Sequence, residues 1–388
     1  MIRSVFYILI FILSTAYVNA AIPNDGIDDS KSIENMIMNS PPGSTVSLKT
    51  GTYDICSKIN IKNIKNIKII GSGLVEFKKC PSFNDEYIIY IIDSERVTIE
   101  NISFWGLTTQ PYIDSDNTNV VWGEQGVLFS GTQNSAILNS RFYNFGDAAL
   151  RVTSSRSHPS GEKINSRHFL AQGNIFHNVT QVTTTHVWSN DFGGTEDITF
   201  KHNLFSNMKG GLKLSSRKPV SQAVIESNIF SEIHGSAIEM NYYSKLIVQN
   251  NVFNNIGKFI LNAYPNSIHN INEAINWNNL TFSKNQIINA KGGIRIVSDI
   301  PGELVDSKYV SGILIALNTF VNVDMSVYGS NNKYYNIINM LTNGEKKFIF
   351  SVIKNNIYQL PKNVGFFNSL AAPEVILTDN IELSSPIQ

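Results

Sequence analysis

One pattern of apolar and polar positions returns again and again along the chain: apolar-x-apolar-x-x-Asn-x-Phe-x-Asn. The stretches "ITFKHNLFSNMKG" and "LIVQNNVFNNIG" are two of its copies. Around the Phe, apolar and polar residues alternate with a period of two, which is the period of a β-strand and not of a helix. The pattern therefore predicts a chain built from many short strands.

The copies align on one large apolar residue, which we call the anchor. The anchors are Phe142, Phe176, Phe205, Phe230, Phe253, Ile287, Phe320 and Ile357, with a weaker copy at Phe104. Most copies carry Asn two residues before the anchor and Asn again two residues after it. Asn tolerates the left-handed backbone of tight corners, and stacked Asn side chains can pass amide hydrogen bonds along a column.

The intervals between anchors run from 23 to 37 residues, and the shortest are close to one coil of three short strands and three turns. One coil cannot bury its own apolar face, so only a stack of coils is stable. The repeat therefore predicts a solenoid of roughly ten coils, with Phe above Phe inside and Asn above Asn at the corners.

The first twenty residues have the features of a signal peptide. Arg3 precedes the apolar stretch "SVFYILIFILSTA", and small residues follow at positions 18–20. We expect cleavage near Ala21, export to the extracellular space or the periplasm, and one domain over residues 21–388 that stays monomeric. The alternative is a retained membrane anchor, and no other stretch approaches the ~20 apolar residues that a membrane span needs.

Two further stretches resemble known sequences. "NDGIDDSKSIENMI" at 24–37 and "PPGSTVSLKTGTYDI" at 41–55 look like the opening and first coil of the pectate-lyase-like superfamily, and so does the repeat. This resemblance implies an all-β fold, a right-handed parallel β-helix solenoid with a short N-terminal capping helix at 29–39. Ile33, Met36 and Ile37 would lie on its buried face, and Asp29 or Ser30 would cap it.

The coil length also bears on Cys56 and Cys80, the only cysteines, which stand 24 residues apart. One coil of ~24 residues would bring them to ~5 Å, where a disulfide can form in an oxidising compartment. Two buried free thiols are the alternative.

Charge narrows the choice of partners. Lys plus Arg and Asp plus Glu number 31 each, so the net charge of zero gives no reason to expect nucleic acid or an anionic membrane. The superfamily itself holds lyases, hydrolases, epimerases and surface proteins, so the resemblance selects no activity. Specific polygalacturonase, pectate-lyase and epimerase motifs are missing, although "HVWSND" at 186–191 is loosely similar to one lyase element.

A second strand after each anchor carries one outward residue per coil. We call this row the polar file, and its expected members are Arg151, Thr183, Lys213, Glu239, Asn262 and Arg295. The additional residues of the long intervals follow this row, so loops would wall a groove over it. Another row is interpreted as ordinary surface side chains with weak ion pairs between neighbouring strands, and it consists of Gln172, Lys201, Glu226 and Gln249.

In a lyase, Lys213 would be the base, beside Arg151 and Arg217, and Arg217 or Arg295 would bind the uronate carboxylate. In a glycosidase, Glu239 and Asp191 would be the carboxylate pair. Glu239, Asp191 and Glu196 could hold Ca²⁺, which is the one candidate cofactor. His186 and Trp188 are expected to contact sugar, whereas His177, His186 and His202 lack the close spacing of a zinc site.

The sequence therefore favours a secreted protein that cleaves a polysaccharide, by β-elimination or by glycoside hydrolysis, in a groove over the polar file. The alternative is a non-catalytic secreted or surface protein that binds glycans or a host partner. Whether the protein is an enzyme stays open at this point.

Overall fold

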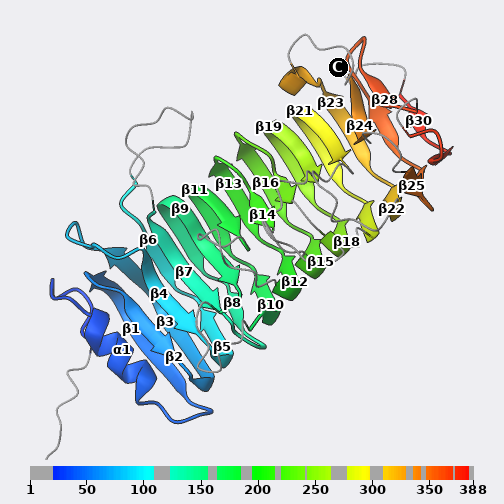
Figure 1. Ribbon diagram of the computed structural model, residues 1–388. Helices are drawn as coiled ribbons and strands as arrows, with labels where there is room; N and C mark the ends of the chain where they lie inside the picture. Colours follow the sequence, from blue (N-terminus) through cyan, green and yellow to red (C-terminus); the bar gives the residue numbers. More distant parts are fainter. Residues whose placement is uncertain are drawn as a thin grey trace, which may run out of the picture.

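The computed structural model describes residues 21–108, 123–155, 164–184, 195–214, 220–240, 243–263, 278–297, 309–328, 335–341, 347–369 and 372–383. Within these ranges the chain forms one helix, α1 (Ser30–Met38), one 3-10 turn, η1 (Ser326–Tyr328), and thirty strands in a single sheet. The paired strands run parallel, and the sheet winds into a long stack of coils with α1 at its N-terminal end (Figure 1). The predicted signal peptide lies outside the described residues.

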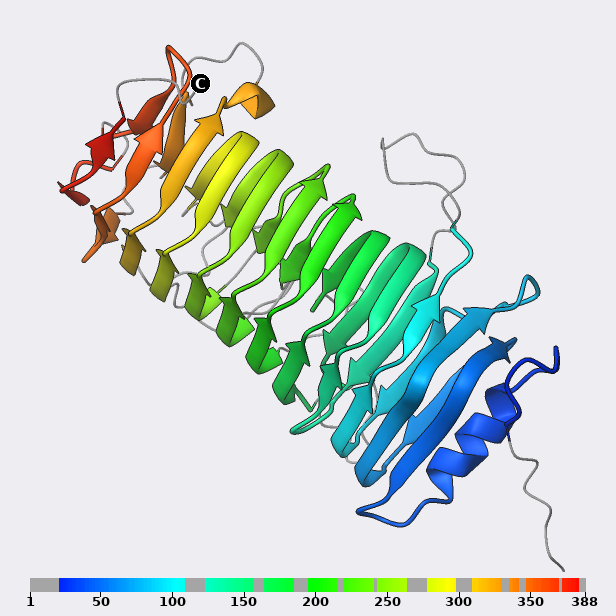
Figure 2. The same cartoon turned by 180° about the vertical axis from the view of Figure 1, so that it is seen from behind.

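Each full coil contributes one strand to each of three faces, which run the length of the stack and can be followed from both sides (Figure 2). Face A consists of the first halves of β1 (Thr45–Ile55) and β3 (Lys65–Lys79), then β5 (Glu95–Glu100), β8 (Ala136–Leu138), β10 (Ser166–Gln172), β12 (Thr195–Lys201), β15 (Val220–Glu226), β18 (Tyr243–Gln249), β20 (Asn278–Ser283), β22 (Tyr309–Ala316), β25 (Lys347–Ile349), β26 (Val352–Lys354) and β29 (Ile376–Thr378). Face B consists of the second halves of β1 and β3, then β6 (Ser103–Trp105), the first halves of β9 (Arg141–Thr153) and β11 (Ile175–Thr183), β13 (Leu204–Met208), β16 (Ile229–Ile233), the first halves of β19 (Val252–Ala263) and β21 (Gln286–Val297), β23 (Thr319–Val323), β27 (Ile357–Gln359) and β30 (Ile381–Glu382). Face C consists of β2 (Ile59–Lys62), β4 (Tyr87–Ile92), β7 (Gln125–Ser130), the second halves of β9, β11, β19 and β21, and β14 (Leu212–Leu214), β17 (Ile238–Met240), β24 (Asn336–Leu341) and β28 (Gly365–Phe367).

The anchors from Phe104 to Phe253 form a continuous aromatic column inside face B. Neighbouring rings from Phe104 to Phe253 lie nearly parallel, with centroids 4.6–5.1 Å apart. The predicted inward residues of face C are buried as well, from Leu150 through Ile294. Because each coil covers the apolar face of the next, the predicted stack is confirmed.

The last copy of the repeat corrects one register assignment. Phe320 pairs with Tyr358, so Tyr358 is the anchor there, and Ile357 points outward with 38% of its surface exposed. Asn356 stands two residues before Tyr358 and joins the Asn column. The motif "NNIY" offers two apolar residues in succession, and only pairing with the coil below selects between them.

A buried amide ladder connects faces A and B. Its members are Asn174, Asn203, Asn228, Asn251, Asn285, Asn318, Asn356 and Asn380, and each Oδ1 accepts from the side-chain Nδ2 of the coil before, except at Asn174, which follows Ser140. The second predicted column, two residues after the anchor, has positive φ at every position from Asn144 to Asn322. Both roles predicted for Asn are therefore confirmed, each in a different column.

Helix α1 covers the N-terminal end of the stack as predicted, with Ile33 and Ile37 fully buried. Asp29 occupies the N-cap position, but its side chain does not cap the helix. Its carboxylate accepts from the backbone N–H groups of Ile22 and Asp54 instead, and burial raises its pKa to about 6. In the described part of the chain, no helix is both long and apolar enough to span a membrane.

The disulfide between Cys56 and Cys80 is present, with a Cα–Cα distance of 4.8 Å. It joins two successive coils directly behind α1, at the level where β1 and β3 end. The prediction from the coil length is confirmed.

Candidate functional site

The predicted polar file exists as a single column on face C. Strand pairing places Arg151 opposite Thr183, Thr183 opposite Lys213, Lys213 opposite Glu239, and so on through Asn262 to Arg295. Asn339 on β24 continues it by one more coil. Successive members of the file are therefore about 4.8 Å apart along the stack.

The first part of the polar file is covered. Arg151 is only 4% exposed, its Nε donates to Gln125 Oε1 at 2.7 Å, and a terminal nitrogen lies 3.5 Å from Asp147 Oδ2. Thr183 is also buried, and its hydroxyl donates to the backbone oxygen of Lys213. The guanidinium that was predicted to contact substrate is thus bound by Gln125 of the coil before and by Asp147 of its own strand.

The exposed part begins at Lys213 and Glu239. The ammonium of Lys213 lies 3.7 Å from Glu239 Oε1, and the two side chains are 39% and 40% exposed. Arg151, which was expected to act on Lys213, stands two coils away, so Glu239 is the nearest charged neighbour in the file. This arrangement places a cation and a carboxylate side by side in solvent reach.

Arg295 stands three coils from Lys213, which is roughly 14 Å along the stack at the spacing of neighbouring strands. Its guanidinium lies 5.6 Å from the centre of the Phe259 ring. A carboxylate held by Arg295 would therefore belong to a different sugar unit from the one at Lys213.

Four predicted residues, Asp191, Arg217, His186 and Trp188, lie outside the described residues, and their roles stay predictions. Glu196 is described, but it lies on face A, where Arg167 Nε is 2.9 Å from its carboxylate, so it does not join Glu239 on face C. Among the described residues, no group of three His, Cys, Asp or Glu side chains is placed to hold a metal ion.

The sequence did not single out Lys79, which is buried beside a hollow of about 400 Å³ near the N-terminal coils. Its Nζ donates to the Glu86 backbone oxygen at 3.2 Å, lies 3.9 Å from Glu124 Oε1, and sits 4.4 Å above the Phe83 ring. Burial lowers the pKa of Lys79 to about 8, against the opposing influence of Glu124 and Asp85. The Glu124 carboxylate also accepts from backbone N–H groups of two neighbouring turns, so this pair cross-links coils.

A further hollow of about 490 Å³ lies where four successive coils turn from face B into face C. Its lining includes Asn255, Asn289 and Asn322, which belong to the positive-φ column after the anchors. The repeat contained this column, but the sequence showed only its backbone role. We call this site the corner hollow.

Comparison with known proteins identifies the fold. No protein-family model matches the sequence, and no curated protein matches it. Among solved structures, the surface protein and adhesin PfbA of Streptococcus pneumoniae is similar over 94% of this chain and 96% of its own, with a TM-score of 0.63 and 10% identity. The family 28 exopolygalacturonase of Yersinia enterocolitica matches 93% of this chain and 74% of its own, with a TM-score of 0.60 and 14% identity.

A mannuronic acid specific family 6 polysaccharide lyase from human gut microbiota is also similar, over 92% of this chain and 81% of its own, with a TM-score of 0.54 and 16% identity. Such low identities establish shared architecture alone. The chain therefore has the right-handed parallel β-helix fold that its sequence predicted.

Proposed function

We propose that the protein is exported, acts as a monomer on a linear acidic polysaccharide that lies along the polar file of face C, and cleaves it by β-elimination. The observation that supports this most is the one-per-coil column that runs from Lys213 through Glu239 and Asn262 to Arg295. Because the coils follow one another at a constant spacing, the successive sugar units of a polymer along the stack would lie over corresponding positions of successive coils. Similar folds in an exopolygalacturonase and a mannuronic acid specific lyase agree with such a substrate.

In this proposal neutral Lys213 takes the proton α to the uronate carboxylate, and the electron pair of that C–H bond forms the carbon–carbon double bond. The glycosidic oxygen leaves with its bonding pair and takes up a proton from water. Arg295 binds the carboxylate of a uronate three coils along the polymer. Because an amine accepts a proton only through a free lone pair, Lys213 must first release its own proton, and Glu239 at 3.7 Å is the nearest acceptor in the file.

Hydrolysis has less support among the described residues. A glycosidase needs two carboxylates, ~5 Å apart or ~6.5–9.5 Å apart. Glu239 is the one carboxylate of the polar file from Arg151 to Asn339. Asp191 would have to be the second.

Glycan binding without cleavage is the second candidate, and the ion pair between Lys213 and Glu239 favours it. A lysine that is held as an ammonium binds anionic sugars well but cannot act as a base. The adhesin PfbA shows that this architecture also occurs in a surface protein.

One experiment separates these functions. The mature protein is incubated with polygalacturonate, alginate, hyaluronan and xylan, and near-ultraviolet absorbance, new reducing ends and retention in affinity gels are recorded. Elimination predicts absorbance that Lys213→Ala abolishes and that Lys201→Ala on face A leaves unchanged. Arg295→Ala should raise KM about tenfold or more, as expected for the loss of a charged hydrogen bond.

The other outcomes are equally distinct. Reducing ends without absorbance indicate hydrolysis, and retention without either product indicates a binding protein. If none of the acidic polymers is retained or cut, the assignment of the polar file to acidic polysaccharide is wrong.

A further inference from the structure

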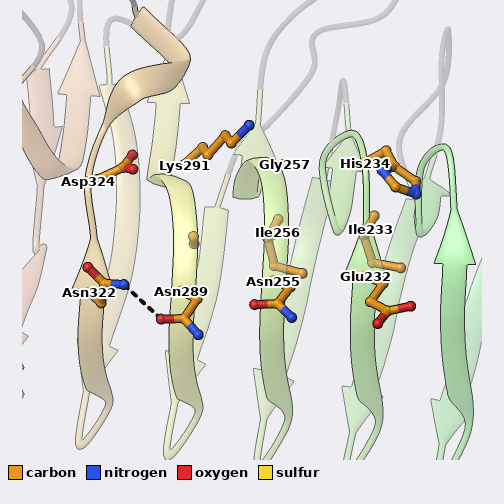
Figure 3. A pocket seen from close by; sticks show the side chains of 11 residues that line it. Glu232, Ile233, His234, Asn255, Ile256, Gly257, Asn289, Lys291, Asn322 and Asp324 are labelled. Atoms are coloured by element: carbon orange, nitrogen blue, oxygen red, sulfur yellow. Dashed lines mark hydrogen bonds between the residues drawn. The ribbon is translucent and has the colours of Figure 1, made fainter. Parts of the chain in front are cut away.

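The corner hollow is separate from the polar file and has a chemistry of its own. Figure 3 shows two parallel rows of positions across four coils. The lower row contains Glu232, Asn255, Asn289 and Asn322, and the upper row contains His234, Gly257, Lys291 and Asp324. The volume of about 490 Å³ lies within the range of small-molecule sites, ≈ 300–1,000 Å³.

Strand geometry explains the two rows. Positions two residues apart on a strand point to the same side, and the residue between them points inward. Here the inward residues are Ile233, Ile256 and Ala290, which pair in register from coil to coil and are all buried. The rows are therefore held at fixed spacing by the core of the β-helix.

The depth of the hollow comes from a tight corner. A Cβ atom on Gly257 would lie 2.3 Å from the His234 backbone oxygen, so this position cannot carry a side chain without moving a coil. The upper row therefore has a gap between His234 and Lys291 (Figure 3).

The 3-10 turn η1 packs against the strand that carries Lys291. The side chain of Val327 in η1 lies against Gly292, where an added Cβ would be 2.9 Å from Val327 Cγ1. The ring of Tyr328, also in η1, packs against Phe259 with centroids 5.4 Å apart.

The side chains of the hollow suit hydroxyl groups. Each amide offers two donors and an acceptor, and one contact is already formed internally, from Asn322 Nδ2 to Asn289 Oδ1 at 2.8 Å. Burial lowers the pKa of His234, so the imidazole is largely neutral at neutral pH, and its Nε2 lies 3.3 Å from Asn207 Oδ1. Two carboxylates and one ammonium among the lining residues give no excess positive charge that would attract a polyanion.

Glu232 is the exception in its column. The equivalent residue in every other coil from Asn144 to Asn322 is Asn, with φ between 50° and 65°, and Glu232 has φ 56°. Asn accepts the left-handed conformation more readily than Glu does. The backbone therefore gives no reason for a carboxylate at this one corner, whereas a ligand with paired hydroxyl groups does.

We propose that the corner hollow binds a neutral oligosaccharide, with its chain parallel to the stack, one sugar ring over Gly257, and hydroxyl groups bound by Glu232 and the amides of Asn255 and Asn289. This site goes beyond the proposed function, because it lies outside the polar file and takes an uncharged ligand. It would hold the protein on a neutral glycan while the polar file acts on an acidic one.

Isothermal titration calorimetry on the mature protein tests this, with cellohexaose, xylohexaose, mannohexaose, maltohexaose and hexagalacturonate as probes. At least one neutral probe should bind, and Glu232→Asn and Asn289→Ala should each raise its Kd about tenfold, as for a lost ligand hydrogen bond. Glu232→Asn restores the residue that the column otherwise carries, so its melting temperature should not fall. Glu226→Gln, in the same coil but on face A, and Lys213→Ala, in the polar file, should leave the Kd unchanged.

Three results would overturn the proposal. They are no binding of any neutral probe, binding that Glu232→Asn leaves intact, and binding that Lys213→Ala removes. The proposed function has a separate test, since acidic polymer could still be cut by a protein whose corner hollow binds nothing.

Discussion

The buried amide ladder should stabilise the stack, and Asn228→Ala measures how much. Asn228 is 1% exposed. Its Oδ1 accepts from the backbone N–H and from Nδ2 of Asn203, both at 2.9 Å. Its Nδ2 donates to Asn251 Oδ1 and to the Phe200 backbone oxygen. The substitution to Ala removes all four bonds at once.

The magnitude follows from the groups left behind. Asn203 Nδ2 keeps a second acceptor, the Ala171 backbone oxygen, and Asn251 Oδ1 keeps the backbone N–H of Asn228. The Asn203 N–H and the Phe200 oxygen lose these partners inside the stack. Each buried unsatisfied group costs about 1–3 kcal/mol, so Asn228→Ala should lower the free energy of unfolding by about 2–6 kcal/mol.

Asn380→Ala is the matched control, because Asn380 is the last member of the ladder and is only half-buried. Water can reach the groups that it leaves, so its cost should be below about 1 kcal/mol. Urea unfolding followed by far-ultraviolet circular dichroism compares the two variants with the parent protein. If Asn228→Ala costs no more than Asn380→Ala, the ladder does not stabilise the stack in the way argued here.

Three further predictions concern the coils. The Cys56–Cys80 disulfide closes a loop of 24 residues, so its reduction should lower the free energy of unfolding by about 3 kcal/mol. Urea unfolding with and without reductant measures this change, and an unchanged midpoint would contradict the prediction. The pKa of Lys79 is 10.5 in the unfolded chain and about 8 in the folded protein, so the unfolded state binds more protons between pH 8 and pH 10.5. The free energy of unfolding, compared with that of Lys79→Met, should therefore rise over this pH range. A flat difference between the two melting curves over that range would refute it. Gly211→Ala places a Cβ 2.2 Å from a backbone oxygen of the next coil and should cost about 1–3 kcal/mol, whereas at Gly210 the nearest atom is 3.8 Å away and Ala should be tolerated; equal melting temperatures would contradict this.

Much of the fold could be predicted because every coil of a β-helix repeats the same pattern of buried positions in the sequence. Phe205 and Phe230 are neighbours in space because they hold the same position in successive copies, and the same logic found the disulfide. The predicted anchor was wrong at Ile357, where two apolar residues follow each other and only pairing across coils selects Tyr358.

The candidate site could be predicted less well, since its chemistry depends on contacts between coils that share no pattern. Arg151 was placed correctly in the polar file, but nothing in its own copy shows that Gln125, from the coil before, binds its guanidinium. The corner hollow could not be predicted from the sequence, for a different reason. The left-handed backbone at these corners already accounts for its Asn residues, and only the structure shows that Gly257 leaves a gap beside them.

One buried ring, Phe259, contacts both the polar file and the turn η1. Phe259 lies beneath the guanidinium of Arg295 in the polar file and against Tyr328 of η1, the turn that follows Asp324 of the corner hollow. Inward residues of a β-helix are fixed by stacking, so outward residues can vary without loss of the fold, which is why so different a set of proteins shares this architecture. Phe259 belongs to both classes, since it is 7% exposed at the corner where face B turns into face C. The ring that supports Arg295 is therefore also the ring against which Tyr328 of η1 packs.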